Sequence, residues 1–201
     1  MLTLFHAPQS RSSRIIWLLE ELSADYRIEY VDIPRQDGSG APDPKNPHPD
    51  KKVPALMHDG ALITESAAIA LYLTDMHPKA GLGPLPGDLD RGAYLSWLSY
   101  YAGVIEPVIH FAFFGLSDNA ALKRTFRGVP EMHQRLLGTL AHQDFLVGNR
   151  FSAADVLLAS LGLWMRPMLP EGKVMDDYLA RCNARPALQA ANAKDAPPRA
   201  S

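Results

Sequence analysis

Three serines near the start of the chain are the first residues whose type and position suggest chemistry. Ser10, Ser12 and Ser13 lie between a short apolar run at 2–5 and an amphipathic pattern that indicates a helix. The start of a helix presents unpaired N–H groups and a partial positive charge, which favour an anion. A hydroxyl at this point could donate to a bound thiolate and lower the pKa of that thiol. Helix capping explains the same serines equally well.

A second anion site is suggested by Thr64-Glu65-Ser66, where a short apolar run gives way to an amphipathic helix. The N–H groups of that helix start suit a carboxylate, and the hydroxyl of Ser66 adds a donor. Glu65 could accept a hydrogen bond from an ammonium group on the same ligand. Taken alone, the triplet is also typical of a helix N-cap with a first-turn acid.

Between these two sites, Val53-Pro54 opens a strand-like run. If this peptide bond is cis, the N–H and C=O of Val53 face outward and can pair with a ligand's peptide group, as an added strand would. Only about 5–6% of X–Pro bonds in folded proteins are cis, so an edge-strand proline is the simpler explanation of the dipeptide alone. Lys51 and Lys52 could pair with a carboxylate or remain solvated. Arg11 could add positive potential.

The elements that must position these groups begin with strand, helix and strand. Apolar residues at helical spacing follow the serines, and a second strand is predicted at 28–33, which together indicate a βαβ unit with a parallel strand pair. Residues 34–49 are too rich in proline and glycine for regular structure. Two short runs at 54–57 and 61–63 are joined by Asp59-Gly60, the preferred hairpin turn, before a helix from about Ala67.

Only helical patterns follow the linker-like segment GLGPLPGD at 81–88. One long helical stripe, with a kink expected at Pro107, carries aromatic residues that are mostly core, although one face could line an apolar pocket. The stripe residues assigned to that pocket are Tyr94, Trp97, Tyr101 and Ile105. Ser152-Ala-Ala-Asp155 is a capping box that we assign to folding. The tail from Ala193 is expected to be frayed or disordered.

Composition narrows the classes of function. The chain has 201 residues, 47% apolar content, a net charge of −2 and one cysteine, Cys182. That charge gives no reason to expect nucleic acid or an anionic membrane as partner, and one cysteine excludes an internal disulfide framework or a CxxC pair. No apolar stretch approaches the roughly 20 residues of a membrane span. The sequence shows no secretory signal, short metal-ligand pattern, Walker loop, GxGxxG or GxSxG.

With these residues in view, the chain resembles the cytosolic glutathione transferases, specifically a bacterial member. The combination KVPAL…LTES…AIALYL, residues 52–73, carries most of the resemblance. FSAADVLLAS at 151–160 is similar to the capping-box helix of the family's second domain, and RPALQAA at 185–191 to its terminal helix. The resemblance implies a thioredoxin-like α/β domain (1–77) with a cis-proline at Pro54, a linker (78–87) and an all-α domain (88–201). It also implies a homodimer.

The resemblance also implies roles for the residues named above. Val53 would pair with the cysteinyl backbone of glutathione, Glu65 and Ser66 would hold its γ-glutamyl end, and Lys52 or a neighbour its glycyl carboxylate. An apolar second substrate would lie between the first helix and the long helix at 94–114.

The family's thiol-activating residue is a tyrosine, serine or cysteine early in the chain, and this sequence has no tyrosine before Tyr26 and no cysteine there. Counting from Pro8, Ser10 occupies the place where serine-type members carry their hydroxyl. Cysteine-type members would align Arg11 with their cysteine, followed by Ser12. The expected order of candidates is therefore Ser10, then Ser12, then Ser13.

The function implied is that of a glutathione transferase, an enzyme of detoxification that conjugates the glutathione thiolate to small hydrophobic electrophiles. Alternatives on the same fold are glutathione-dependent peroxide reduction, dehalogenation or isomerisation, and a non-catalytic protein that binds proteins or hydrophobic ligands. Glutathione is the expected co-substrate, with no metal. A cytoplasmic homodimer without nucleic-acid or membrane partners is expected.

Overall fold

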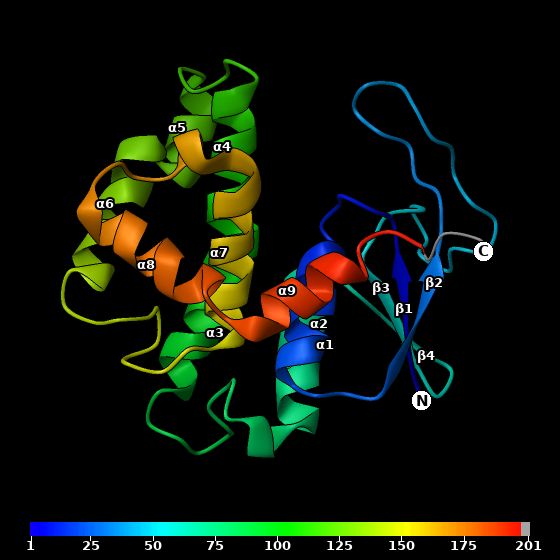
Figure 1. Cartoon of the computed structure of the whole chain (residues 1–201). Coiled ribbons are helices and arrows are strands. Elements are labelled where there is room, and N and C mark those ends of the chain that lie inside the picture. Colours follow the sequence, from blue (N-terminus) through cyan, green and yellow to red (C-terminus); the bar gives the residue numbers. More distant parts are fainter. Residues whose placement is uncertain (198–201) are drawn as a thin grey trace. The chain divides into compact units, whose positions relative to one another are not determined.

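The computed structural model describes residues 1–197. The chain forms two compact units. The first unit is Met1–Ala80 together with the segment from Arg185 onward, and the second is Gly81–Ala184 (Figure 1). The boundary between Ala80 and Gly81 falls inside the expected linker, 78–87.

The first unit contains a four-stranded sheet in the order β2-β1-β3-β4. Its strands are β1 (Leu2–His6), β2 (Tyr26–Tyr30), β3 (Ala55–His58) and β4 (Ala61–Thr64). β1 and β2 are parallel, whereas β3 is antiparallel to both β1 and β4. Asp59 and Gly60, both with positive φ, connect β3 to β4, so the predicted hairpin and the predicted parallel pair are both confirmed.

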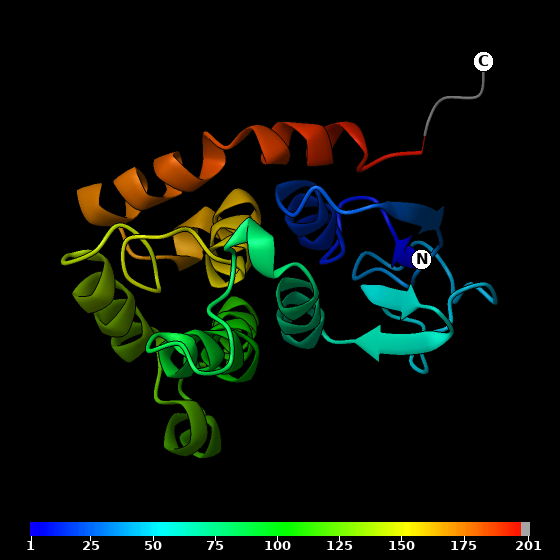
Figure 2. The ribbon, with the colours of Figure 1, turned by 90° about the horizontal axis from the view of Figure 1, so that it is seen from below.

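The helices of this unit are α1 (Ser13–Glu21), α2 (Ser66–Met76), the 3-10 turn η1 (Pro78–Ala80) and α9 (Pro186–Ala193). Helix α1 buries five consecutive apolar residues, from Ile15 to Leu19, which is more than one apolar stripe. It does so because it contacts both α2 and α9, and Figure 2 shows α1 between these two helices.

The position of α9 differs from the expected extent of the helical domain, 88–201. Leu188 and Ala191 of α9 are buried, and Arg185 donates two hydrogen bonds to the Glu21 carboxylate of α1, at 2.6 and 2.7 Å. The segment belongs to the first unit because α9 packs on the second apolar face of α1 and buries it. The tail was expected to be frayed from Ala193, but Lys194 and Asp195 make defined contacts that are described below.

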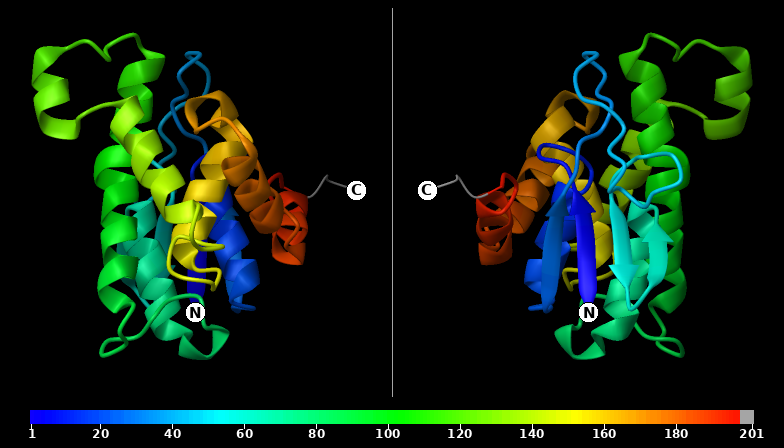
Figure 3. Two further views of the ribbon diagram at one scale, coloured as in Figure 1. Left: turned by 90° about the vertical axis from the view of Figure 1, so that its left-hand side faces the viewer. Right: turned by 90° about the vertical axis from the view of Figure 1, so that its right-hand side faces the viewer.

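The second unit is helical throughout its regular elements, as expected. Its elements are α3 (Arg91–Tyr100), the π-helical turn η2 (Tyr101–Ile105), α4 (Glu106–Phe113), α5 (Ala120–Phe126), α6 (Val129–Leu140), α7 (Ala153–Met165), the 3-10 turn η3 (Arg166–Met168) and α8 (Lys173–Asn183). α3, η2 and α4 follow one another along one long axis (Figure 3). The irregularity predicted at Pro107 is the π-helical turn before it, since proline lacks the N–H that a regular helix would use.

Helix α7 is the centre of this unit and starts with the predicted capping box. The N–H and hydroxyl of Ser152 both donate to Asp155 Oδ2 at 2.8 Å, while Asp155 Oδ1 accepts from the Leu146 N–H at 2.8 Å and the Tyr178 hydroxyl at 3.1 Å. Every residue from Ala153 to Leu161 is buried. The capping box therefore has the folding role that was assigned to it.

Candidate functional site

Strand register places the three predicted motifs at one end of the sheet. Phe5, near the end of β1, is opposite Ala55, the first residue of β3, and Ala55 is opposite Thr64, the last residue of β4. Three segments must therefore converge at this end of the sheet. They are the turn after β1 that carries Ser10, Ser12 and Ser13 (the serine turn), the Val53-Pro54 step before β3, and the start of α2 at Glu65-Ser66. Contact of Val53 with Ala7 and Val31 in one small apolar cluster holds the first two together.

The Val53-Pro54 peptide bond is cis, as the resemblance implied. In the part of the chain that the structure describes, the N–H and C=O of Val53 have no hydrogen-bond partner. The loop before this step is held by the fully buried Asn46. Its side-chain amide donates to the Lys52 main-chain carbonyl at 3.0 Å, and its own main-chain carbonyl accepts from Lys51 Nζ at 2.6 Å. Lys52 itself is exposed. Val53 thus presents backbone groups that an extended peptide can pair with.

The start of α2 is not capped by its own side chains. Ser66 is the first residue of the helix rather than its N-cap, and Glu65 occupies the N-cap position without a side-chain capping bond. The capping explanation of this triplet is therefore not the one that the structure shows. Glu65 has φ 68°, a left-handed conformation that is strained for a residue with a Cβ and concentrates at functional sites. Its side chain is exposed.

The serine turn gives its hydroxyl groups different surroundings. Ser10 is 7% exposed, and its hydroxyl donates to the Ala7 carbonyl at 2.7 Å. Ser12 is fully buried, with its oxygen 2.7 Å from Ser10 Oγ and 2.7 Å from His6 Nδ1. Ser13 donates to Asp195 Oδ1 at 2.5 Å. None of these hydroxyl groups caps α1 in the usual way, although the Ser10 N–H and Ser13 Oγ are 3.3 Å apart.

His6 is a buried member of this site that the sequence pattern did not identify. Its side chain is fully buried at the end of β1, where burial lowers the pKa of the imidazole below its usual 6.5 and Asp195 opposes that shift. The neutral ring is therefore the favoured form at neutral pH. Asp195, which approaches His6 from a distant part of the chain, was missed too, since no local motif marks either residue.

The residues predicted to line an apolar pocket are buried in the second unit. Tyr94 and Ile105 are fully buried, Tyr101 is 2% exposed and Trp97 is 7% exposed. The Tyr101 hydroxyl donates to Glu106 at 2.9 Å. Their burial favours the core role that such a stripe usually has, and a substrate-lining role for these four residues stays a prediction.

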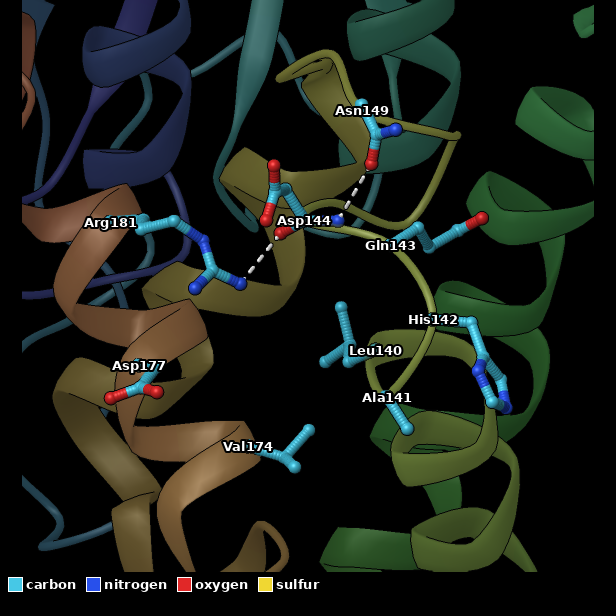
Figure 4. A pocket seen from close by; sticks show the side chains of 9 residues that line it. All are labelled: Leu140, Ala141, His142, Gln143, Asp144, Asn149, Val174, Asp177 and Arg181. Atoms are coloured by element: carbon cyan, nitrogen blue, oxygen red, sulfur yellow. Dashed lines mark hydrogen bonds between the residues drawn. The ribbon is translucent and has the colours of Figure 1, made fainter.

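A cavity of about 280 Å³ lies elsewhere in the second unit (Figure 4). It is lined by Leu140, Ala141, His142, Gln143, Asp144, Asn149, Val174, Asp177 and Arg181. None of the predicted site residues is among them. Hydrogen bonds from Arg181 to the Asp144 carbonyl (3.0 Å) and from the Asp144 N–H to Asn149 (3.1 Å) order its loop, which is a structural use of these side chains.

Within residues 1–197, no group of three or more histidine, cysteine, aspartate or glutamate side chains is arranged to hold a metal ion. Nor does that part of the chain contain a helix long and apolar enough to cross a membrane.

Comparison with known proteins gives matches over both units. Residues 1–75 match the family model of the glutathione S-transferase N-terminal domain, and residues 102–190 match that of the C-terminal domain. Glutathione S-transferase 3 of Schizosaccharomyces pombe is 29% identical over 179 residues, covering 77% of this chain and 70% of its own. Glutathione S-transferase GstA of Escherichia coli O157:H7 is 28% identical over 166 residues, covering 80% and 81%.

Solved structures extend this similarity to nearly the whole chain. A glutathione transferase from Methylococcus capsulatus superposes with a TM-score of 0.79 at 28% identity, covering 97% of this chain and 98% of its own. A sphingomonad glutathione S-transferase complexed with glutathione gives 0.77 at 30% identity, covering 96% and 98%.

Proposed function

This chain belongs to the glutathione S-transferase family, and from that premise we propose that it conjugates glutathione to small hydrophobic electrophiles in a detoxifying role. The observation that carries the proposal is the convergence of three ligand-ready features at one end of the sheet: the unpaired backbone groups of Val53, the uncapped start of α2 and the Ser10 turn. Each feature suits one part of a small anionic peptide with a thiol.

Binding follows from the chemistry of those features. The N–H and C=O of Val53 pair with the cysteinyl backbone as an added strand does. The N–H groups of the α2 start and the Ser66 hydroxyl receive the γ-glutamyl carboxylate, while the exposed Glu65 carboxylate accepts from its ammonium group. Lys52 is exposed and faces the glycyl carboxylate in this scheme. Arg11, exposed on the serine turn, adds positive potential.

Ser10 is the hydroxyl that we assign to thiol activation. The Ser13 hydroxyl donates a hydrogen bond to Asp195, and Ser12 is fully buried. Ser10 donates to a local carbonyl, that of Ala7, and can exchange that acceptor for a thiolate. Each unit by which the thiol pKa falls corresponds to about 1.36 kcal/mol of preferential stabilisation of the thiolate.

The reaction then needs no nucleophile from the protein. The thiol releases its proton to solvent, and the thiolate forms a C–S bond at the electrophilic carbon. With a chloronitrobenzene, the C–Cl bond breaks and chloride leaves with the bonding electrons. Positioning of the thiolate and stabilisation of its charge are the contributions of the chain.

The role of Ser10 is tested by measuring conjugation of a chloronitrobenzene. We expect Ser10→Ala to lower kcat/KM about 100-fold, the size of effect seen when one donor to a reacting anion is removed. Ser96→Ala is the matched control, since Ser96 is exposed on α3 and bonds only within its own helix. Turnover of Ser10→Ala equal to that of the control would rule out Ser10 as activator.

Glutathione binding is tested separately by calorimetry. Loss of the Ser66 hydroxyl removes one hydrogen bond to a charged group, so Ser66→Ala should raise the Kd by roughly tenfold or more. If the wild-type protein itself bound no glutathione, the transferase proposal and its peroxidase, dehalogenase and isomerase alternatives would fall together.

We also propose a cytoplasmic homodimer. The resemblance to the family supports it. Light scattering should give twice the 22.1 kDa of one chain, and a mass near that of one chain would contradict the dimer.

A further inference from the structure

The segment after α9 contacts the turn that carries Ser10. Asp195 Oδ2 accepts from the Gln9 N–H at 2.9 Å and Oδ1 accepts from the Ser13 hydroxyl at 2.5 Å. The main-chain carbonyl of Asp195 lies 2.8 Å from His6 Nε2. A single residue therefore meets the turn at three points, on both sides of Ser10 and at the histidine behind it.

Hydrogen-bond donors and acceptors determine where the protons of this cluster lie. A carbonyl oxygen can only accept, so the bond to Asp195 requires the proton of His6 on Nε2. In the neutral ring Nδ1 then carries a lone pair, and the contact with Ser12 at 2.7 Å requires the Ser12 hydroxyl to donate. Ser12 Oγ is left as an acceptor, for the Ala7 N–H at 3.3 Å and toward Ser10.

Ser10 is held by the same chain of contacts. Its oxygen accepts from the Ser12 N–H at 3.2 Å. Since the Ser12 hydroxyl donates its hydrogen bond to His6, it does not donate one to Ser10. The Ser10 hydroxyl is then oriented by fixed neighbours, and its one proton lies between the Ala7 carbonyl and Ser12 Oγ until a thiolate takes their place as acceptor.

We propose that Asp195 and His6 are positioning residues for the Ser10 hydroxyl, acting through the hydrogen bond that His6 donates to the Asp195 carbonyl and the hydrogen bond that Ser12 donates to His6. This inference rests on the proposed role of Ser10. Neither residue contacts the residues that were assigned above to glutathione binding. Figure 2 shows α9 and α2 on different sides of α1. Asp195 therefore acts on the turn from the side of α9, away from the start of α2.

The contacts of Asp195 are not needed to hold α9 in place. That helix is already docked by buried Leu188 and Ala191 and by the Arg185–Glu21 ion pair at 2.6 Å. Lys194, the residue before Asp195, adds an ion pair with Glu20 at 2.6 Å. The three bonds of Asp195 go instead to the serine turn and to His6.

The kinetic test compares Asp195→Ala with Lys194→Gln in the full chain. Lys194→Gln removes a neighbouring contact of the same segment and leaves Asp195 in place. With a chloronitrobenzene as electrophile, we expect Asp195→Ala to lower kcat about tenfold and to change the KM for glutathione less than threefold, because a loosened turn misplaces the donor rather than the binding groups. The pH at which the bound thiol is half ionised, read from thiolate absorbance, should rise by about one unit.

Two substitutions of His6 separate the two bonds of the ring. His6→Asn keeps an acceptor for Ser12 and loses the bond to Asp195, whereas His6→Gln keeps a donor toward Asp195 and loses the acceptor for Ser12. His6→Asn loses the bond to the Asp195 main-chain carbonyl, and Asp195→Ala removes the carboxylate bonds to Gln9 and Ser13 that hold this carbonyl in place. Both changes weaken the same link, so their combined effect on kcat should be clearly less than the product of the two single effects. Multiplicative effects, or equal kinetics in Asp195→Ala and Lys194→Gln, would overturn the inference.

A spectroscopic measurement tests the same chain without turnover. Ring-nitrogen NMR of the labelled wild type should show His6 protonated on Nε2. In Asp195→Ala the main-chain carbonyl loses the side-chain bonds to Gln9 and Ser13 that hold it against the ring, so a mixture of tautomers is expected. The charged and titratable groups facing the ring are the Asp195 carboxylate, 3.6 Å from Nε2, and Tyr30, whose ring is 5.6 Å away. A wild-type ring protonated on Nδ1 would overturn the inference whatever the turnover, whereas absent turnover alone would count against the proposed function.

Discussion

At the end of β1, three hydroxyl groups within four residues have three different hydrogen-bond partners: a main-chain carbonyl, an imidazole and a carboxylate. The choice of Ser10 over its neighbours rests on those partners. The resemblance to serine-type family members, counted from Pro8, ranked Ser10 first, but it could not identify His6 or Asp195. These two residues are 189 positions apart in sequence, and only the docking of α9 on α1 brings them together. Such a contact has no local signature.

His6 should also make stability depend on pH. Burial lowers the pKa of its imidazole in the folded chain below 6.5, so the neutral ring is favoured there. The associated stability is complete above the unfolded pKa of about 6.5 and is lost as pH falls through the lower folded value. Urea unfolding at pH 7.5 and pH 5 should therefore show a larger loss for the wild type than for His6→Gln. Equal losses would contradict a lowered pKa.

Among the elements, those with strong local signals were predicted well. The hairpin at Asp59-Gly60 and the capping box at Ser152 follow from side chains that satisfy backbone groups a few residues away. The start of α2 was harder to predict. Serine is a typical N-cap residue, but the N-cap of α2 is Glu65, in a left-handed conformation, and Ser66 is the first residue of the helix.

The capping box gives a prediction for helix α7. Burial raises the pKa of Asp155 to about 6, while its four accepted hydrogen bonds favour the carboxylate. Asp155→Ala leaves buried donors of Ser152, Leu146 and Tyr178 unpaired and should cost about 3 kcal/mol in the free energy of unfolding. Urea denaturation measures this cost. Asp118→Ala is the control, since Asp118 is exposed and its loss should leave the urea midpoint unchanged.

At the scale of the whole chain, an α/β domain followed by a helical domain was predicted and is confirmed by both family models. The packing of α9 on α1 was not foreseen, because the sequence of α9 is helical like that of the elements before it. α9 covers the second apolar face of α1. Periodicity predicts that a helix has an apolar face but not which partner it meets.

A ligand that binds only the folded chain should raise its stability. If glutathione binds as proposed, a concentration 100 times the Kd should add about 2.7 kcal/mol to the free energy of unfolding. Thermal unfolding with and without glutathione measures this gain. Ser66→Ala at the same glutathione concentration should gain less, and an equal gain in both proteins would place the ligand elsewhere.

The first unit is built from two stretches of chain, Met1–Ala80 and the segment from Arg185, separated by the whole of the second unit. During synthesis, the outer apolar face of α1 therefore has no cover until about 105 further residues have followed Ala80. At 5–20 residues per second, this interval lasts roughly 5–20 s. Throughout it the nascent chain exposes an apolar helix face that a chaperone can bind, and the Ser10 turn acquires its final neighbours only after Asp195 has been synthesised.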